Sequence, residues 1–153
     1  MATTKKTAAK RAPAKKAPAK KTTGLSAEEK AAMKETMAER RSKDPAADQA
    51  AKIAALPDDD RKICETVRDL ATKHAPDLVQ RTYYGMPAWG NAEGRVVFFV
   101  QPSSKFKVRY STLGFEQPAK LDDGTMWPSA YAILKVSKAD ERRIAELITR
   151  AVS

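Results

Sequence analysis

In the stretch GRVVFFVQPSSKFKVRYSTLGF (residues 94–115), two strand patterns follow one another. Residues 95–101 are apolar on both alternating faces, which is typical of a central strand that is covered on two sides. In residues 105–111, apolar side chains at 106, 108 and 110 alternate strictly with basic side chains at 105, 107 and 109. The short connection PSS therefore predicts that these two strands pair as an antiparallel hairpin.

Strand and helix patterns lie on both sides of this hairpin. Residues 80–84 and 131–136 have strand composition, and NAEG (91–94) is a turn signal. Helices are predicted from a capping box at Ser26 to about residue 41, from Asp44 to about residue 56, over 58–74, and after a second capping box at Ser137. The order predicts an α+β fold with N-terminal helices, an antiparallel sheet of about four strands, and a closing C-terminal helix.

Most of the net charge lies at the N-terminus. The chain of 153 residues has a formal charge of +10, and residues 1–24 contain eight cations and no acid. The cations are Lys5, Lys6, Lys10, Arg11, Lys15, Lys16, Lys20 and Lys21. Because Pro13 and Pro18 interrupt any helix and large apolar groups are missing, we expect a disordered tail. We therefore divide the chain into a tail (1–24), a peripheral helical segment (25–52) and an α+β domain (53–153).

The tail resembles the Lys/Ala/Pro-rich tails of linker histones and of some bacterial nucleoid proteins. Its paired cations predict sequence-nonspecific contact with nucleic acid phosphates, since no aromatic or amide side chain is present to recognise a base. A solubilising tail and contact with an anionic membrane surface are the alternatives. No apolar run is long enough to span a membrane. We expect a cytoplasmic protein with no membrane partner, associated with the nucleoid if the tail binds DNA.

An aromatic cluster around YYGMPAWG (83–90) is the main candidate for a binding site. Pro87 indicates a strand edge or a bulge there, so that part of the cluster faces a groove. Core packing of the same side chains is the alternative. The predicted pocket, for a small molecule or an extended peptide, consists of Tyr84, Met86, Trp89, Lys107, Arg109, Tyr110 and Trp127.

Acidic side chains give weaker candidates for a metal site. Asp58, Asp59 and Asp60 begin a predicted helix, where carboxylates offset the helix dipole, and Asp122 and Asp123 lie in a turn signal. With one His, the single Cys64 and no glycine-rich phosphate loop or other catalytic signature, the sequence favours a protein that is not an enzyme and has no cofactor.

Residues from about 53 to the end resemble the YdhG-like family, a bacterial group of largely unknown function. The resemblance is carried by YYGMPAWG, by residues 94–115, by LDDGTMWPSAYAI (121–133) and by the final helix. It implies a compact α+β domain. Some members are described as frataxin-like iron chaperones, so it also implies iron as a ligand, which would fall on the acidic positions above. The leading hypothesis is a binding protein whose tail tethers it to nucleic acid, and an iron chaperone is the alternative.

Overall fold

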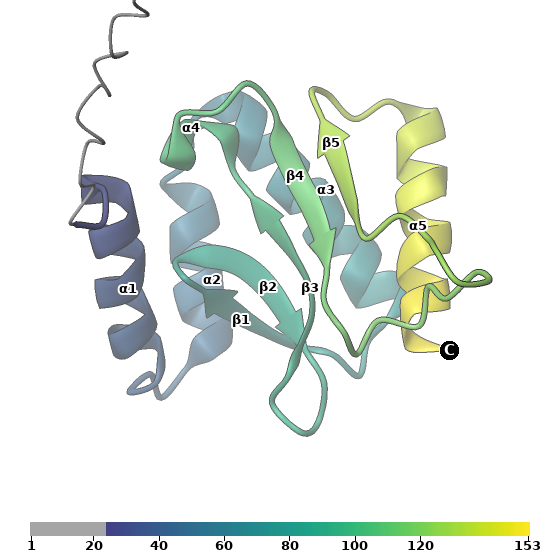
Figure 1. Cartoon of the computed structure of the whole chain (residues 1–153), viewed down its shortest axis with the longest axis horizontal. Helices are drawn as coiled ribbons and strands as arrows, with labels where there is room; N and C mark the ends of the chain where they lie inside the picture. Colours follow the sequence, from purple (N-terminus) through teal and green to yellow (C-terminus); the bar gives the residue numbers. More distant parts are fainter. Residues whose placement is uncertain (1–23) are drawn as a thin grey trace, which may run out of the picture.

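Five strands form one antiparallel sheet in the order of the sequence. The computed structural model describes residues 24–153. The strands are β1 (Val79–Tyr83), β2 (Met86–Gly90), β3 (Val96–Gln101), β4 (Ser111–Phe115) and β5 (Ala130–Ile133). Each strand pairs with the next, so β1 and β5 are the two edges of the sheet (Figure 1).

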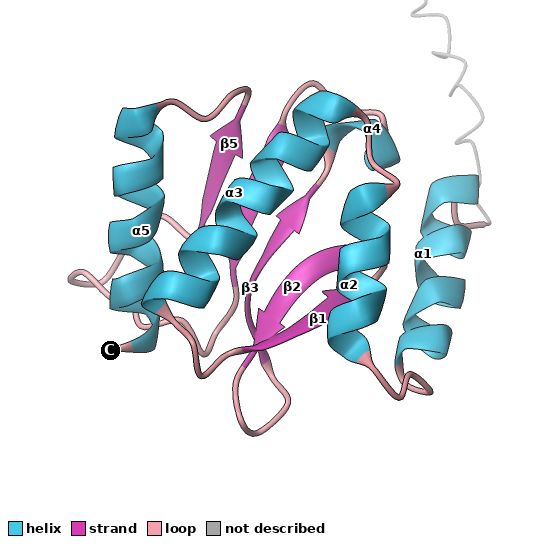
Figure 2. Cartoon of the chain, turned by 180° about the vertical axis from the view of Figure 1, so that it is seen from behind, coloured by secondary structure: helices cyan, strands magenta, loops and turns pink. Residues whose placement is uncertain are grey.

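Helices cover one face of this sheet. The helices of the described residues are α1 (Ala27–Glu39), α2 (Pro45–Ala54), α3 (Asp58–His74), α4 (Ser103–Phe106) and α5 (Lys138–Val152), of which α2, α3 and α5 cover that face. Figure 2 shows α2, α3 and α5 side by side in front of the sheet, whereas Figure 1 shows the opposite face without a covering helix. This arrangement confirms the predicted α+β class, with helices first, an antiparallel sheet and a closing helix.

The core lies between the sheet and these three helices. Trp89 stacks on Phe98 with ring centroids 5.0 Å apart, and Phe98 contacts Phe115 at 5.8 Å. The apolar stripes that predict α3 and α5 face this layer, since Val67 and Ile148 are fully buried. Both predicted capping boxes are present, at Ser26 with Glu29 and at Ser137 with Asp140.

The second strand is the one that the sequence does not predict separately. Tyr84 and Gly85 both have positive φ, 50° and 76°, as the two central residues of a tight hairpin turn require. Pro87 lies opposite Thr82, and the pairing of β2 with β3 begins one residue later at Ala88. A proline is tolerated there because the missing N–H precedes the ladder to β3. The sheet consequently has five strands rather than about four.

The predicted strand over 105–111 is wrong. Residues 103–106 form the short helix α4, Lys107 is left-handed with φ of 52°, and β4 begins only at Ser111. The cause is the buried carboxylate of Asp60 on α3. It accepts hydrogen bonds from the Ser103 hydroxyl (2.9 Å), the Ser104 N–H (2.8 Å) and the Ser111 hydroxyl (2.8 Å). These hydrogen bonds hold residues 103–111 in a loop, although the alternation of apolar and basic side chains there is typical of a strand.

The two N-terminal helices are attached in different ways. In α2, Gln49 is fully buried and its Nε2 donates to the backbone oxygens of Arg81 (3.0 Å) and Ala88 (2.7 Å). Ile53 of the same helix joins the core. In α1, by contrast, Ala32 is the buried residue. The predicted disorder of the tail concerns residues that, apart from Gly24, lie outside the described part of the chain.

Candidate functional site

The aromatic side chains after residue 82 lie on both faces of the sheet. Trp89 is 1% exposed in the core, and Met86 is also buried, so neither side chain lines a groove as the predicted pocket requires. On the uncovered face, the Tyr83 ring lies 5.7 Å from Phe99. Tyr84 is exposed in the hairpin turn. The predicted cluster is therefore divided, because successive side chains of a strand point to opposite faces.

Two of the predicted pocket residues do line a groove. Arg109 and Tyr110 lie beside a cavity of about 530 Å³ between the β4–β5 pair and α5. We call it the β5–α5 groove. Its buried apolar lining consists of Leu113, Ile133, Ile144 and Leu147. Its polar and aromatic lining consists of Arg109, Tyr110, Tyr131, Lys135, Asp140 and Arg143.

Cations stand over aromatic rings along this groove. The Arg143 guanidinium lies 5.3 Å from the centre of the Tyr131 ring, and the Arg109 guanidinium lies 5.1 Å from that of Tyr110. Within residues 24–153, no carboxylate lies within ion-pair distance of Arg109, Arg143 or Lys135. These three cations are therefore available to an anion that enters the groove.

The acid in the groove is already engaged. Asp140 Oδ2 accepts hydrogen bonds from the backbone N–H and the hydroxyl of Ser137, at 2.8 and 2.7 Å. The hydrogen bonds from Ser137, backbone first, hold the pKa of Asp140 below its usual value. Asp140 therefore stays ionised as the acidic member of the capping box at Ser137, and the groove keeps an excess of positive charge.

The remaining predicted pocket residues lie elsewhere. Lys107 pairs with Glu28 at 3.0 Å, and Trp127 lies in the loop between β4 and β5, outside the lining of the groove. Conversely, the sequence did not single out Tyr131 or Arg143. Tyr131 alternates with Ile133 on one face of a strand, and Arg143 lies one turn before Leu147 on α5, but only the packing of α5 beside β5 brings them together.

The acidic candidates for a metal site are not gathered. Asp60 is buried in the serine network, Asp58 pairs with Arg61, and Asp122 and Asp123 are exposed after Leu121. Asp59 is exposed at the start of α3. Across residues 24–153, no group of three or more His, Cys, Asp or Glu side chains is placed to hold one metal ion. Iron binding stays a prediction of the resemblance alone.

Cys64 lies in the core rather than in a cleft. It is fully buried on α3. Burial, together with the nearby carboxylates of Asp60 and Glu65, raises the pKa of the thiol to about 12. The thiolate that nucleophilic chemistry requires is therefore suppressed.

In residues 24–153, no helix is both long and apolar enough to cross a membrane. The eight tail cations lie outside this range.

No family model, no curated protein and no solved structure matches the chain. The YdhG-like resemblance thus stays a prediction, and the fold and the groove rest on the structure itself.

Proposed function

We propose that this chain is a binding protein rather than an enzyme, that its β5–α5 groove holds an anionic, partly apolar ligand or partner, and that its tail tethers it to nucleic acid. The groove is the observation that carries the proposal. Its volume of about 530 Å³ lies within the usual range for small-molecule sites.

The lining of the groove determines the ligand class. An apolar floor favours an aliphatic or aromatic group, and the two cation–aromatic pairs favour a carboxylate, sulfonate or phosphate beside it. A small organic anion meets both requirements. An extended acidic peptide meets them too, because β5 is an edge strand that pairs in the sheet only with β4.

An aromatic sulfonate dye tests the groove directly. We expect 8-anilinonaphthalene-1-sulfonate to bind the native full chain with enhanced, blue-shifted fluorescence. The double variant Arg109→Gln/Arg143→Gln should weaken this binding about tenfold, since two charge-assisted contacts are lost. The charge-matched control is Arg142→Gln/Arg150→Gln, which removes two exposed cations of α5 that do not line the groove.

Circular dichroism and thermal unfolding of each variant separate ligand binding from a loosened fold. Equal dye binding by the double variant and the control would contradict a ligand site in the groove. Native mass spectrometry of the protein purified from cells then searches for a bound anion, whose mass identifies the ligand.

The tethering role is tested separately. Nonspecific duplex DNA is titrated with the full chain and with a full-length variant whose eight tail cations are Gln, over several salt concentrations. If all eight cations neutralise phosphates, log K should fall with log salt at a slope of about −7. Equal affinity and slope for the two proteins would remove the tail from the proposed function and leave the groove unaffected.

A further inference from the structure

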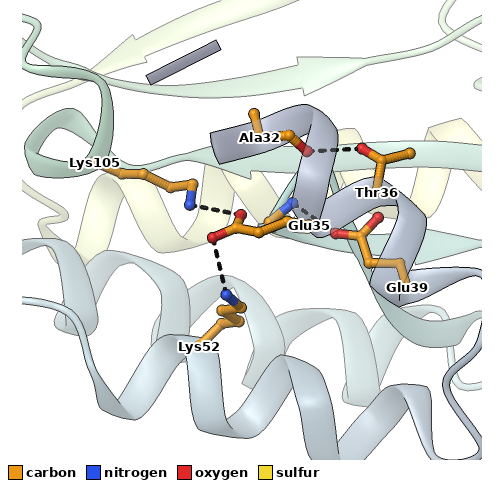
Figure 3. Close-up of polar contacts among 7 residues, drawn as sticks. Ala32, Glu35, Thr36, Glu39, Lys52 and Lys105 are labelled. Atoms are coloured by element: carbon orange, nitrogen blue, oxygen red, sulfur yellow. Dashed lines mark hydrogen bonds and ion pairs between the residues drawn. The ribbon is translucent and has the colours of Figure 1, made fainter. Parts of the chain in front are cut away.

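Helix α1 is held on the domain mainly by its carboxylates. Ala32 is its buried residue, whereas Met33 and Met37 are more than half exposed. Glu35 bridges two lysines, with 2.7 Å from its Oε2 to Lys105 Nζ and 3.1 Å from its Oε1 to Lys52 Nζ. Figure 3 shows the Glu35 carboxylate between these two side chains. Polar contacts, not a buried apolar face, thus fix the helix.

Two more carboxylates of α1 complete the contact. Glu39 Oε1 accepts a hydrogen bond of 2.6 Å from the Gly85 N–H in the β1–β2 turn, and Glu28 Oε1 lies 3.0 Å from Lys107 Nζ. Three carboxylates from one helix therefore meet three ammonium groups and one backbone N–H, which come from α2, α4 with its C-cap and the β1–β2 turn.

The surface under α1 is built to receive an anion. A Cβ on Gly85 would overlap the Oε2 atom of Glu35, so the carboxylate occupies the space that a side chain would need. Lys52 and Lys105 lie on either side of this single carboxylate, and the N–H of Gly85 beside it donates to the Glu39 carboxylate. Converging ammonium and backbone N–H donors are the groups that bind phosphate oxygens.

Burial and the two lysines act in opposite directions on the Glu35 carboxyl. Burial raises its pKa, but the hydrogen bonds and charges of Lys105 and Lys52 prevail, so its pKa lies below the usual value. Glu35 is therefore ionised at neutral pH, and the site holds a bound anion supplied by the chain itself.

We propose that Lys52, Lys105, Lys107 and the Gly85 N–H form a second binding site for the phosphodiester backbone of nucleic acid, which α1 occupies with its own carboxylates in the free protein. The proposal extends the tethering role. Only five residues lie between Lys21 of the tail and Ala27 of α1, so the two residues are at most about 21 Å apart. A strand held by the tail thus lies close enough to displace α1.

Displacement of α1 has a measurable signature in DNA binding. In the full chain, Glu35→Gln/Glu39→Gln removes two of the α1 carboxylates that compete with phosphate for the site. We therefore expect the affinity for duplex DNA to rise about tenfold. Three further phosphate contacts should also steepen the salt slope from about −7 to about −10. The control Glu65→Gln/Asp69→Asn removes the same charge from α3, where neither residue contacts α1. It should raise the affinity for duplex DNA only slightly and leave the salt slope unchanged.

The site itself is tested in the background of the first double variant. Adding Lys105→Gln/Lys107→Gln should abolish the increase in DNA affinity. Adding the charge-matched Lys62→Gln/Lys73→Gln on α3 should leave most of that increase in place. A gain that is no larger than that of the α3 acid control, or that survives the loss of Lys105 and Lys107, would overturn the proposal.

Hydrogen exchange on the unaltered protein gives a second measurement. DNA should accelerate exchange of the α1 amides and leave those of α3 unchanged; α1 amides that stay equally protected at saturating DNA refute displacement. The variant with a neutral tail separates the two proposals. If it binds DNA like the unaltered chain, the tethering role fails, while the gain from the α1 variants still reports on the second site.

Discussion

Asp60 illustrates how one buried side chain determines the path of a distant segment. The residue is 4% exposed, and its carboxylate receives three hydrogen bonds from serines 43 to 51 residues later in the chain. Ser111 in turn accepts a hydrogen bond from the Ser103 N–H at 3.0 Å. The network closes the loop between β3 and β4, and it requires an acceptor with no hydrogen of its own.

Asp60→Asn should lower the free energy of unfolding by about 3 kcal/mol, because an NH₂ donor replaces one carboxylate oxygen and faces either the Ser104 N–H or the two serine hydroxyls in a buried site. Urea unfolding followed by circular dichroism measures the loss. The neighbouring Asp59→Asn, at an exposed position, should change stability by less than about 0.5 kcal/mol. Equal effects of the two variants would show that the network contributes little.

The same network gives a pH dependence. Burial raises the pKa of Asp60, but the hydrogen bonds from Ser104, Ser111 and Ser103 outweigh it, so the folded-state pKa lies below the unfolded value. The stabilisation is therefore complete above about pH 5 and is lost as the pH falls through about 3.9 toward the folded-state pKa. The stability difference between the unaltered protein and Asp60→Asn should shrink over that range.

A glycine is needed at position 114 because a neighbouring aromatic ring fills the space of a side chain, not because the backbone there has an unusual conformation. On the uncovered face of the sheet, Phe99 pairs with Gly114, and a Cβ there would overlap the Phe99 ring. Gly114→Ala should cost about 1–2 kcal/mol. In a Phe99→Ala background, the same change should become neutral or stabilising by up to about 1 kcal/mol, because alanine is favoured over glycine in a strand. A double-mutant cycle from urea unfolding measures this reversal, and a cost that persists without the ring would place the strain elsewhere.

At the scale of elements, the sequence predicts those whose pattern and end signals agree. α3 spans the predicted 58–74, and the capping boxes locate the starts of α1 and α5. The strand pattern over 105–111 fails because three hydrogen bonds to Asp60 override a local alternation, and alternation contains no information about a partner on α3. β2 is not predicted as a separate strand because a glycine turn and a proline interrupt its apolar pattern.

The candidate site is predicted only in part for the same reason. Arg109 and Tyr110 reach the groove although the strand predicted for them, residues 105–111, is not formed. Their partner Arg143 comes from α5, and the packing of that helix beside β5 is a tertiary feature that no spacing in the sequence expresses. Trp89 is buried because its register places it opposite Phe98 on the helix-covered face.

Salt should loosen α1 selectively. Its ion pairs are partly exposed and are screened at high ionic strength, whereas α2 is held by Ile53 and the buried amide of Gln49. We expect the α1 amides to exchange faster than those of α2, and the difference to grow between about 0.05 and 1 M sodium chloride, where the Debye length falls to about 3 Å. Mass spectrometry of exchanged peptides measures both helices at once. Protection of α1 that is insensitive to salt would indicate an apolar attachment instead.

At the scale of the whole molecule, one layer of helices and one sheet share a single core, and α1 stands apart from it. The core cluster extends from Ile53 to Ala151 and includes α2, α3, α5 and four of the strands. α1 contributes no side chain to that cluster and touches the domain mainly through carboxylates. Unfolding should accordingly have two parts, the loss of α1 and the cooperative loss of the remainder.

This separation is measurable because the two tryptophans differ in environment. Trp89 is 1% exposed in the core and Trp127 is 37% exposed in a loop, so a Trp127→Phe variant retains only the core reporter. In that variant, Trp89 fluorescence should follow the cooperative transition in urea. Helical circular dichroism should lose about a fifth of its amplitude earlier, since α1 holds 13 of the helical residues. Adding Glu35→Gln and Glu39→Gln should shift only the early loss to lower urea. Coincident curves for both probes would instead mean that α1 unfolds together with the core, and that its carboxylates stabilise the whole domain.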